Sequence, residues 1–234
     1  MSFDNKVVLI TGAAGALGRA VASAFAAAGA TLALLDLNEQ VLATAYPGVD
    51  GRRLLLAADL ADTDSTRHAV DRAVTGLGRI DCLCNIAGGF DMGPAVHETS
   101  QKLWDAMLGV NAGTLLNAVR AVVPGMIAAG HGSIVNVGAG AGQSGRAHMG
   151  AYSAAKSVVI RLTEAMAAEL REQGINVNCV LPSIIDTPRN RTDMPKADYS
   201  RWVAPQDLAH VIRFLCSEDA RAVHGAAIPV NGLS

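Results

Sequence analysis

A short apolar run near the amino end of the chain is followed directly by three evenly spaced glycines and then by a helical pattern. Residues 6–11 (KVVLIT) are mostly β-branched and show no polar alternation, which suits a strand covered on both faces. Gly12, Gly15 and Gly18 follow, and residues 19–28 continue as a helix. This order predicts a βαβ crossover whose turn can approach a phosphate group.

We expect a separate role for each glycine. Gly12 can make the tight turn, Gly15 can let the backbone approach a pyrophosphate, and Gly18 can bring the helix close to the strand. The free N–H groups at the start of the helix would then point at the phosphates. Glycine is frequent here, with 24 among 234 residues, so the spacing alone says little. The position between a strand and a helix carries the prediction.

Strand and helix patterns alternate along the rest of the chain at the spacing of βαβ units. No Ser/Pro linker, charge run or internal repeat divides it, so we expect residues 1–234 to form a single domain. The predicted fold is α/β, a Rossmann-type doubly wound parallel sheet of about seven strands with helices on both faces. Pro229 indicates a sheet edge. The other strands are expected at residues 31–36, 53–58, 81–86, 132–138, 175–181 and 225–231, and the other helices at 63–77, 99–129 with a break near Pro124, 150 onward and 205–216.

Ligands of such sheets bind at the carboxyl ends of the strands, where Gly12, Asp36, Asp59 and Asn85 all fall. Asp36 ends the second predicted strand about 20 residues beyond the glycines. Its carboxylate can accept hydrogen bonds from ribose hydroxyls while repelling a 2′-phosphate, which favours NAD(H) over NADP(H). The alternative, that Asp36 caps the following helix, stays open.

The segment GAYSAAK at residues 150–156 opens a long alanine-rich helical pattern. Tyr152 and Lys156 lie at positions i and i+4, so both side chains project from one helix face. An ammonium group held there favours the phenolate, and we expect it to lower the pKa of Tyr152 toward neutrality. Tyr152 then becomes a candidate acid/base. The alternative is a tyrosine that packs at a helix start beside a solvated lysine.

The composition excludes several classes of function. Half of the residues are hydrophobic but only 4% are aromatic, so the core is expected to consist of Ala, Val, Leu and Ile. A net charge of −2 provides no basic stripe for nucleic acid or for a membrane surface. The first residues lack a signal peptide, and no uncharged apolar run reaches ~18 residues, so we expect a cytoplasmic protein. The four cysteines lack metal-ligand spacing, so we expect no metal site, and Cys82 and Cys84 are expected as small apolar fillers of a buried strand.

Six ordered motifs resemble the short-chain dehydrogenase/reductase superfamily over essentially the whole chain: Thr11-Gly12 with the later glycines, Asp59-Leu60, Asn85 to Gly88, Asn111, Tyr152 with Lys156, and Ile185 to Pro188. The resemblance implies hydride transfer with a nicotinamide cofactor and assembly as a homotetramer or homodimer. Tyr152 would be the acid/base, Lys156 would hold the nicotinamide ribose, Asn111 would position a proton-relay water, and Thr187 would touch the carboxamide. The cofactor-binding positions that it implies are Gly12, Gly15, Leu17, Gly18, Asp36, Asp59, Leu60, Asn85, Ala87, Gly88, Tyr152, Lys156, Pro182, Ile185 and Thr187.

Three positions depart from the family pattern. The glycines follow G-x-x-G-x-x-G rather than G-x-x-x-G-x-G, and Ser183 replaces a glycine after the proline of the sixth strand. The catalytic serine of the family falls on Ala139. Losing such a donor can cost about 10²–10³ in rate. Either Ser144 replaces it by loop rearrangement, or the substrate does not need the donor, or the domain has lost catalysis.

One subfamily fits the second option. Quinonoid dihydropteridine reductases are similar in the alanine at position 139, the acid for NADH and the segment 186–202, although Asn111 is not their pattern. We therefore expect an NAD(H)-dependent oxidoreductase acting on a small carbonyl, alcohol or quinonoid substrate. A dihydropteridine-reductase-like enzyme and a nicotinamide-binding module without efficient chemistry are the alternatives. Residues 183–204 are predicted to be an irregular lid, and Met149 and Trp202 either line the substrate pocket or pack under it.

Overall fold

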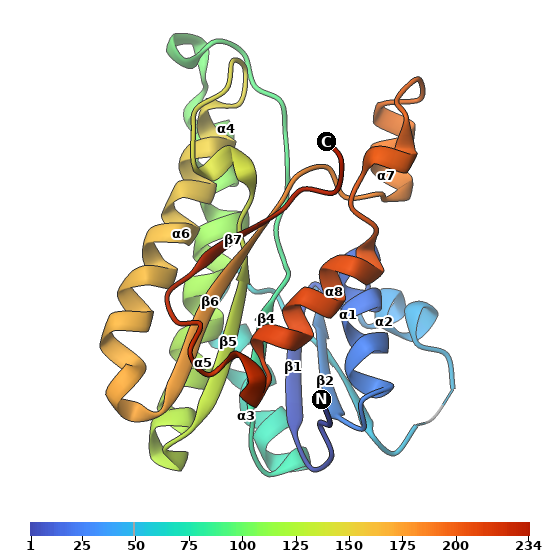
Figure 1. Ribbon diagram of the computed structural model, residues 1–234, viewed down its shortest axis with the longest axis vertical. Coiled ribbons are helices and arrows are strands. Elements are labelled where there is room, and N and C mark those ends of the chain that lie inside the picture. The colour runs from blue at the N-terminus through green and yellow to red at the C-terminus, as the bar shows by residue number, and fades with distance from the viewer. Residues whose placement is uncertain (49) are drawn as a thin grey trace.

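The computed structural model describes residues 1–48 and 50–234. Its centre is a parallel seven-stranded sheet in the order β3-β2-β1-β4-β5-β6-β7, which confirms the predicted α/β fold (Figure 1). β7 is an edge strand and contains Pro229, as predicted. The strands are β1 Val7–Thr11, β2 Thr31–Asp36, β3 Arg53–Ala57, β4 Cys82–Asn85, β5 Gly132–Val137, β6 Ile175–Pro182 and β7 Ala227–Val230.

Helices cover both faces of the sheet (Figure 1). One hydrophobic cluster joins the sheet to α3, α5 and α6, and a second joins it to α1, α2 and α8. Leu9 and Ile10 are neighbours in β1, yet each is fully buried in a different one of these clusters. The helices are α1 Ala16–Ala26, α2 Glu39–Ala45, α3 Thr63–Leu77, α4 Gln101–Leu108, α5 Thr114–Ala129, α6 Gly150–Leu170, α7 Pro188–Asp193 and α8 Pro205–Leu215.

The long helix predicted at 99–129 is irregular at a different point from the one expected. The break near Pro124 is wrong, because α5 carries Pro124 inside the helix. The irregular turn is a π-helix, Gly109–Gly113, between α4 and α5. The side chain of its Asn111 donates a hydrogen bond to the Met107 carbonyl at 3.0 Å, so this carbonyl has a hydrogen-bond donor in the widened turn.

The run Gln101–Ala129 is long and apolar enough, by length and composition alone, to cross a membrane. However, Leu115, Val119, Val122 and Met126 are buried against the sheet in the first hydrophobic cluster. The run is therefore a core helix of this fold.

Residues 183–204, predicted to be irregular, are partly helical. Thr187 accepts a hydrogen bond from the Asn190 N–H at 3.2 Å, and Pro188 occupies the first helical turn, so α7 has both a capping residue and a preset start. A 3₁₀ turn, Tyr199–Arg201, follows. The segment is therefore an ordered insertion that contains one short helix and one 3₁₀ turn.

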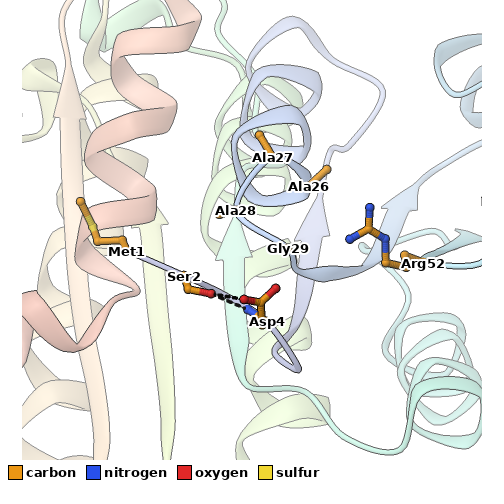
Figure 2. Close-up of a pocket in the computed structure, with 8 residues that line it drawn as sticks. All are labelled: Met1, Ser2, Asp4, Ala26, Ala27, Ala28, Gly29 and Arg52. Atoms are coloured by element: carbon orange, nitrogen blue, oxygen red, sulfur yellow. Dashed lines mark hydrogen bonds between the residues drawn. The ribbon is translucent and has the colours of Figure 1, made fainter.

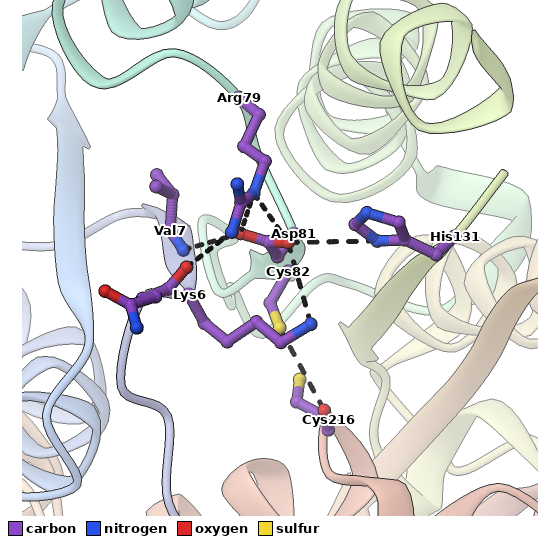
Figure 3. A network of polar contacts seen from close by, with 8 residues as sticks. Lys6, Val7, Arg79, Asp81, Cys82, His131 and Cys216 are labelled. Atoms are coloured by element: carbon purple, nitrogen blue, oxygen red, sulfur yellow. Dashed lines mark hydrogen bonds and ion pairs between the residues drawn. The ribbon is translucent and has the colours of Figure 1, made fainter. Parts of the chain in front are cut away.

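A buried carboxylate ties three strands together at the amino edge of the sheet. The Asp81 side chain is 2% exposed and accepts a hydrogen bond from the Val7 N–H at 2.8 Å. The Arg79 Nε donates to both of its carboxylate oxygens at 3.0 Å, while Lys6 and His131 approach one of them to 3.7 Å (Figure 3). These contacts connect the start of β4 to the segments that lead into β1 and β5.

We expect Asp81→Asn to lower the free energy of unfolding by about 2–4 kcal/mol, because it removes the charge from a buried, multiply bonded group and leaves cations without their partner. Urea denaturation measures this loss. Asp64→Asn is the matched control, since Asp64 is 72% exposed and, among residues 1–48 and 50–234, its one ion pair is with Arg67 on the surface of α3. Equal midpoints for the two variants would contradict the structural role of Asp81.

Candidate functional site

The predicted ligand edge brings together residues from distant parts of the chain. Gly12, Asp36 and Asn85 follow or end β1, β2 and β4, which are adjacent in the sheet. The strand order reverses between β1 and β4, so this edge is the topological switch point where doubly wound folds bind ligands. α6 extends its first turns to the same end of the sheet, because Lys156 bonds Val137 at the end of β5.

Two glycines of the first crossover, Gly12 and Gly18, have no room for a side chain. Gly12 has φ +63°, and a Cβ there would lie 2.9 Å from the Cα of Ala87. A Cβ on Gly18 would lie 2.8 Å from the Cα of Ala13, so helix α1 rests directly on the turn. Gly15 is the N-cap of α1, where an added Cβ would meet only the Gly12 carbonyl, at 3.3 Å. The turn thus offers exposed backbone at a helix N-terminus, which suits a pyrophosphate.

Asp36 braces this turn rather than a helix. Its carboxylate accepts hydrogen bonds from the Ala14 N–H at 2.9 Å and the Leu37 N–H at 2.8 Å. Asn38 caps α2 instead, accepting from the Gln40 N–H at 2.8 Å, so the helix-cap interpretation of Asp36 is wrong. A cavity of about 210 Å³ adjoins the turn, with Ala14, Arg19, Gln40, Val41, Thr44 and Ala45 around it.

Asn111 holds the turn that follows β4. Its Oδ1 accepts from the Gly89 N–H at 3.2 Å, and its Nδ2 donates to the Gly89 carbonyl at 3.0 Å. A Cβ on Gly88 would lie 2.9 Å from Asn111 Oδ1 and 3.4 Å from Lys156 Nζ, so this glycine fits between the two side chains. The Thr11 hydroxyl accepts from the Ala87 N–H at 3.1 Å. The side chain of Asn111 is thus engaged with backbone.

Tyr152 and Lys156 lie on one face of α6, as predicted, with Lys156 Nζ 5.9 Å from the centre of the tyrosine ring. Lys156 is 6% exposed, and its ammonium donates to the Val137 carbonyl at 2.9 Å. Burial lowers the pKa of Lys156 to about 8 and raises the pKa of Tyr152 to about 12. The predicted lowering of the tyrosine pKa is therefore wrong for the chain by itself, because desolvation of the phenolate is the dominant effect.

Ala139 and Ser144 occupy different environments. Ala139 is 6% exposed and extended, at the start of a 3₁₀ turn, Gly140–Gly142. This turn packs on α6, where the Ser157 hydroxyl donates to the Gly142 carbonyl at 2.7 Å. Ser144 is exposed in the loop that leads to α6. The structure thus presents a buried methyl group at position 139.

The remaining predicted site residues have local partners of several kinds. Asp59 is exposed and accepts from the Ala61 N–H at 2.9 Å. Trp202 is 8% exposed and its ring lies 4.8 Å from that of Tyr199, which favours the packing interpretation over a pocket wall. Leu17 and Leu60 are buried, Pro182 ends β6, Ile185 pairs with Val203, Thr187 caps α7 and Met149 precedes α6.

Sequence reasoning missed the contacts that organise residues 183–204. Arg191 makes two hydrogen bonds to Asp186, at 2.6 and 2.7 Å, which lower the pKa of that carboxyl. The Arg191 guanidinium also lies 4.7 Å from the ring centre of Tyr199. Ser183, the unexpected residue after Pro182, donates to the Asn231 carbonyl at 2.7 Å. The mixture of charged and aromatic residues in this segment was the available signal.

A larger surface cavity lies away from this site. It has a volume of about 560 Å³ and lies where β1 begins and α1 ends, at the amino edge of the sheet (Figure 2). Ser2 and Asp4 bond to each other there, and Arg52 stands across from them (Figure 2). In residues 1–48 and 50–234, no group of three or more His, Cys, Asp or Glu side chains could hold a metal ion. Cys82 and Cys84 are buried, as predicted, and Cys179 and Cys216 are buried as well.

A Rossmann-type sheet with a glycine-rich first crossover and a Tyr–Lys pair on α6 defines a class of nicotinamide-dependent oxidoreductases. The family model for "short chain dehydrogenase" matches residues 6–198. The chain therefore belongs to the short-chain dehydrogenase/reductase family and is an NAD(P)-dependent oxidoreductase.

Relatives and solved structures are similar over nearly the whole chain. D-threitol dehydrogenase of Mycolicibacterium smegmatis is 34% identical over 241 residues, spanning 98% of this chain and 92% of that protein. Meso-2,3-butanediol dehydrogenase of Serratia marcescens is 35% identical, spanning 99% and 95%. The crystal structure of NAD⁺-bound xylitol dehydrogenase matches with a TM-score of 0.91 at 27% identity, covering 99% of this chain and 100% of that one.

The lowered pKa of Lys156 predicts a pH-dependent stability. The folded chain loses this proton near pH 8, whereas the unfolded chain keeps it up to 10.5, so stability from this group is reduced below pH 8 and recovers as the pH rises. We expect Lys156→Met to gain stability relative to wild type at pH 7. The gain should shrink by about 1.4 kcal/mol per pH unit above pH 8.

Urea denaturation of both proteins under reducing conditions between pH 7 and pH 9.5 measures this difference. Taking the difference cancels the titration of the buried cysteines and tyrosines whose pKa Lys156 does not influence, which leaves Cys179 as the group coupled to the substitution. A gain that stays constant over the range would contradict the buried, perturbed lysine.

Proposed function

We propose that this chain is an NAD(H)-dependent oxidoreductase that interconverts small alcohols and carbonyl compounds, with Tyr152 as the acid/base. The observation that carries the proposal is the placement of Lys156. Its ammonium group lies between the end of β5, the glycine turn after β4 and the face of α6 that bears Tyr152. This placement joins the predicted cofactor edge to the predicted proton donor.

The groups of the chain fit a dinucleotide. The turn from Gly12 to Gly18 leaves backbone N–H groups available at the start of α1, and Asp36 stands at the end of the neighbouring strand. Within residues 1–48 and 50–234, Lys156 Nζ donates one hydrogen bond, so two of its three N–H groups remain for ribose hydroxyls. A bound nicotinamide would supply the hydride acceptor or donor.

The proton balance follows from the tyrosine. In carbonyl reduction a hydride adds to the carbonyl carbon and the Tyr152 hydroxyl gives its proton to the oxygen, forming the alcohol; oxidation runs in reverse. Because burial raises the pKa of Tyr152 to about 12, the phenol is protonated at pH 7 and is ready to donate. Asn111 contributes by holding the Gly88–Gly89 turn under this site.

We expect wild-type protein to oxidise NADH with at least one member of a panel of small ketones, diketones and quinonoid dihydropterin. Tyr152→Phe should lower kcat/KM by roughly 10²–10⁴, because it removes the transferred proton. The affinity for NADH, measured by fluorescence titration, should stay unchanged in this variant. Undiminished turnover by Tyr152→Phe would exclude Tyr152 as the acid/base.

Ala139 keeps two alternatives under test, a dihydropteridine-reductase-like enzyme and a nicotinamide-binding module with weak or no catalysis. The same assay, run on wild-type protein and on Ala139→Ser, separates them. Turnover of the dihydropterin alone would favour the first alternative, and tight NADH binding without turnover of any substrate would favour the second. A large gain in ketone reduction with the serine would mean that the natural substrate does not require that donor.

Asp36 supports a preference for NAD(H) over NADP(H), because its carboxylate faces the same turn as the phosphate-binding glycines and would repel a 2′-phosphate. We expect Asp36→Ala to weaken NADH binding and to shift the NADPH/NADH affinity ratio toward NADPH by about 10-fold or more, because placing like charges side by side in a binding site costs roughly a few kcal/mol and about 1.4 kcal/mol corresponds to tenfold. Fluorescence titrations with both cofactors measure the ratio. The exposed Asp64→Ala is the control, and equal ratios in both variants would contradict the assignment.

We further propose that residues 1–234 act as a single domain, and that residues 183–204 form a substrate lid. The two ends of this segment meet, since the Val203 N–H donates to the Ile184 carbonyl at 2.9 Å. A loop whose ends are joined in this way can move as a unit, as a lid does. A homotetramer or homodimer through the helices that bear Asn111 and Tyr152 is supported by Trp104, an α4 side chain that is 39% exposed. A cytoplasmic location completes the proposal.

A further inference from the structure

The segment between β4 and α4 is fixed to the π-helix at one point and to the start of α6 at two points. The Gly89 backbone is bonded to Asn111 in both directions. The Gly93 N–H donates to the His148 carbonyl at 2.8 Å, just before α6 begins. A Cβ on Gly150, the first residue of α6, would lie 2.9 Å from Val96 Cγ2. The residues between these anchors are therefore held beside the first turn of the helix that bears Tyr152.

Phe90 is the residue of this segment that contacts Tyr152. The two ring centres are 4.9 Å apart and the ring planes are at 87°, an edge-to-face pair. Phe90 nevertheless remains 43% exposed, so part of its ring is free beside the tyrosine. Met92 and Val96 in the same segment are 56% and 74% exposed. Such exposure of large apolar side chains next to a proposed acid/base indicates a surface that a ligand can cover.

Resting on the proposed function, we infer that Phe90 is a specificity-determining residue that forms an apolar wall beside the Tyr152 hydroxyl and selects apolar cyclic secondary alcohols and their ketones over open-chain polyols. A ring methylene gains contact with the phenyl group. A polyol hydroxyl in the same place loses hydrogen bonds to water that the phenyl group cannot replace. At position 139, where the family resemblance expects a serine hydroxyl, this chain has the buried methyl group of Ala139.

Such a wall would separate the chain from the relatives whose names specify open-chain polyols or diols. Discrimination by one methylene in an apolar pocket reaches roughly 10–200-fold, and polar selectivity depends on donors placed for each hydroxyl. Asp91, His97 and Gln143 are exposed in the neighbouring loops, but the residue of the segment between β4 and α4 that packs on the Tyr152 ring is the apolar Phe90. The wall therefore acts on the part of the substrate nearest to the reacting carbon.

The test measures kcat/KM for cyclohexanol and for xylitol, with NAD⁺, in wild type, Phe90→Ala and Phe90→Leu. We expect wild type to prefer cyclohexanol by at least about 10-fold. Phe90→Ala should reduce that preference by about 10-fold or more, chiefly through KM, and Phe90→Leu should keep most of it because an apolar wall remains. Val74→Ala is the matched control, an apolar side chain on α3 that is 41% exposed.

Two further readouts distinguish the possible failures. Saturation-transfer NMR of cyclohexanone with the NADH complex of Tyr152→Phe should give a signal that the double variant with Phe90→Ala loses, which supports the wall independently of turnover.

Preference of wild type for xylitol, or an unchanged ratio in Phe90→Ala with turnover intact, overturns the inference while leaving the proposed function standing. A change of oligomeric state in Phe90→Ala, seen by light scattering, overturns it in favour of a second copy covering the residue. Absence of turnover of either alcohol by wild type, together with absence of turnover across the ketone panel, overturns both proposals.

Discussion

The parallel sheet must be covered on both faces, and the rest of the molecule follows from this requirement. Parallel strands need crossover helices, and because the crossovers are right-handed the helices change from one face to the other where the strand order reverses, between β1 and β4. All loops that leave the carboxyl ends of the strands then meet at one edge. The positions of Gly12, Asp36 and Asn85 are set by where β1, β2 and β4 end. The proposed site is thus a consequence of how the sheet is buried.

The same burial controls the electrostatics of the site. A buried lysine and a largely buried tyrosine shift in opposite directions, since each favours its neutral form. Lys156 offsets part of this cost through the Val137 carbonyl, and its position next to Gly88 leaves donors for a ligand. The chain alone therefore holds a protonated phenol at neutral pH. Any lowering of the tyrosine pKa has to come from charge that is brought in with the cofactor.

The periodicity of the chain was sufficient to predict most of the fold. Residues 31–36 and 63–77 were predicted with their observed bounds, because each is a run of uniform pattern with clear ends. The π-helix at Asn111 could not be predicted, since it depends on a hydrogen bond to Met107 and on contacts with Gly89, which is distant in sequence. The prediction of the Tyr152 pKa was wrong for a similar reason. The spacing of the sequence shows that Lys156 is a neighbour of Tyr152, but it does not show how deeply the two side chains are buried.

We propose that Tyr152 and Lys156 face the reactive ring of a dinucleotide held by the first crossover. A crystal structure of the chain with NADH is the decisive measurement. We expect the pyrophosphate over the turn from Gly12 to Gly18, the nicotinamide ribose within hydrogen-bond distance of Lys156 Nζ, and the Tyr152 hydroxyl on the side of the nicotinamide that the substrate occupies. A nicotinamide bound away from α6, or a tyrosine hydroxyl turned from it into solvent, would rule this arrangement out.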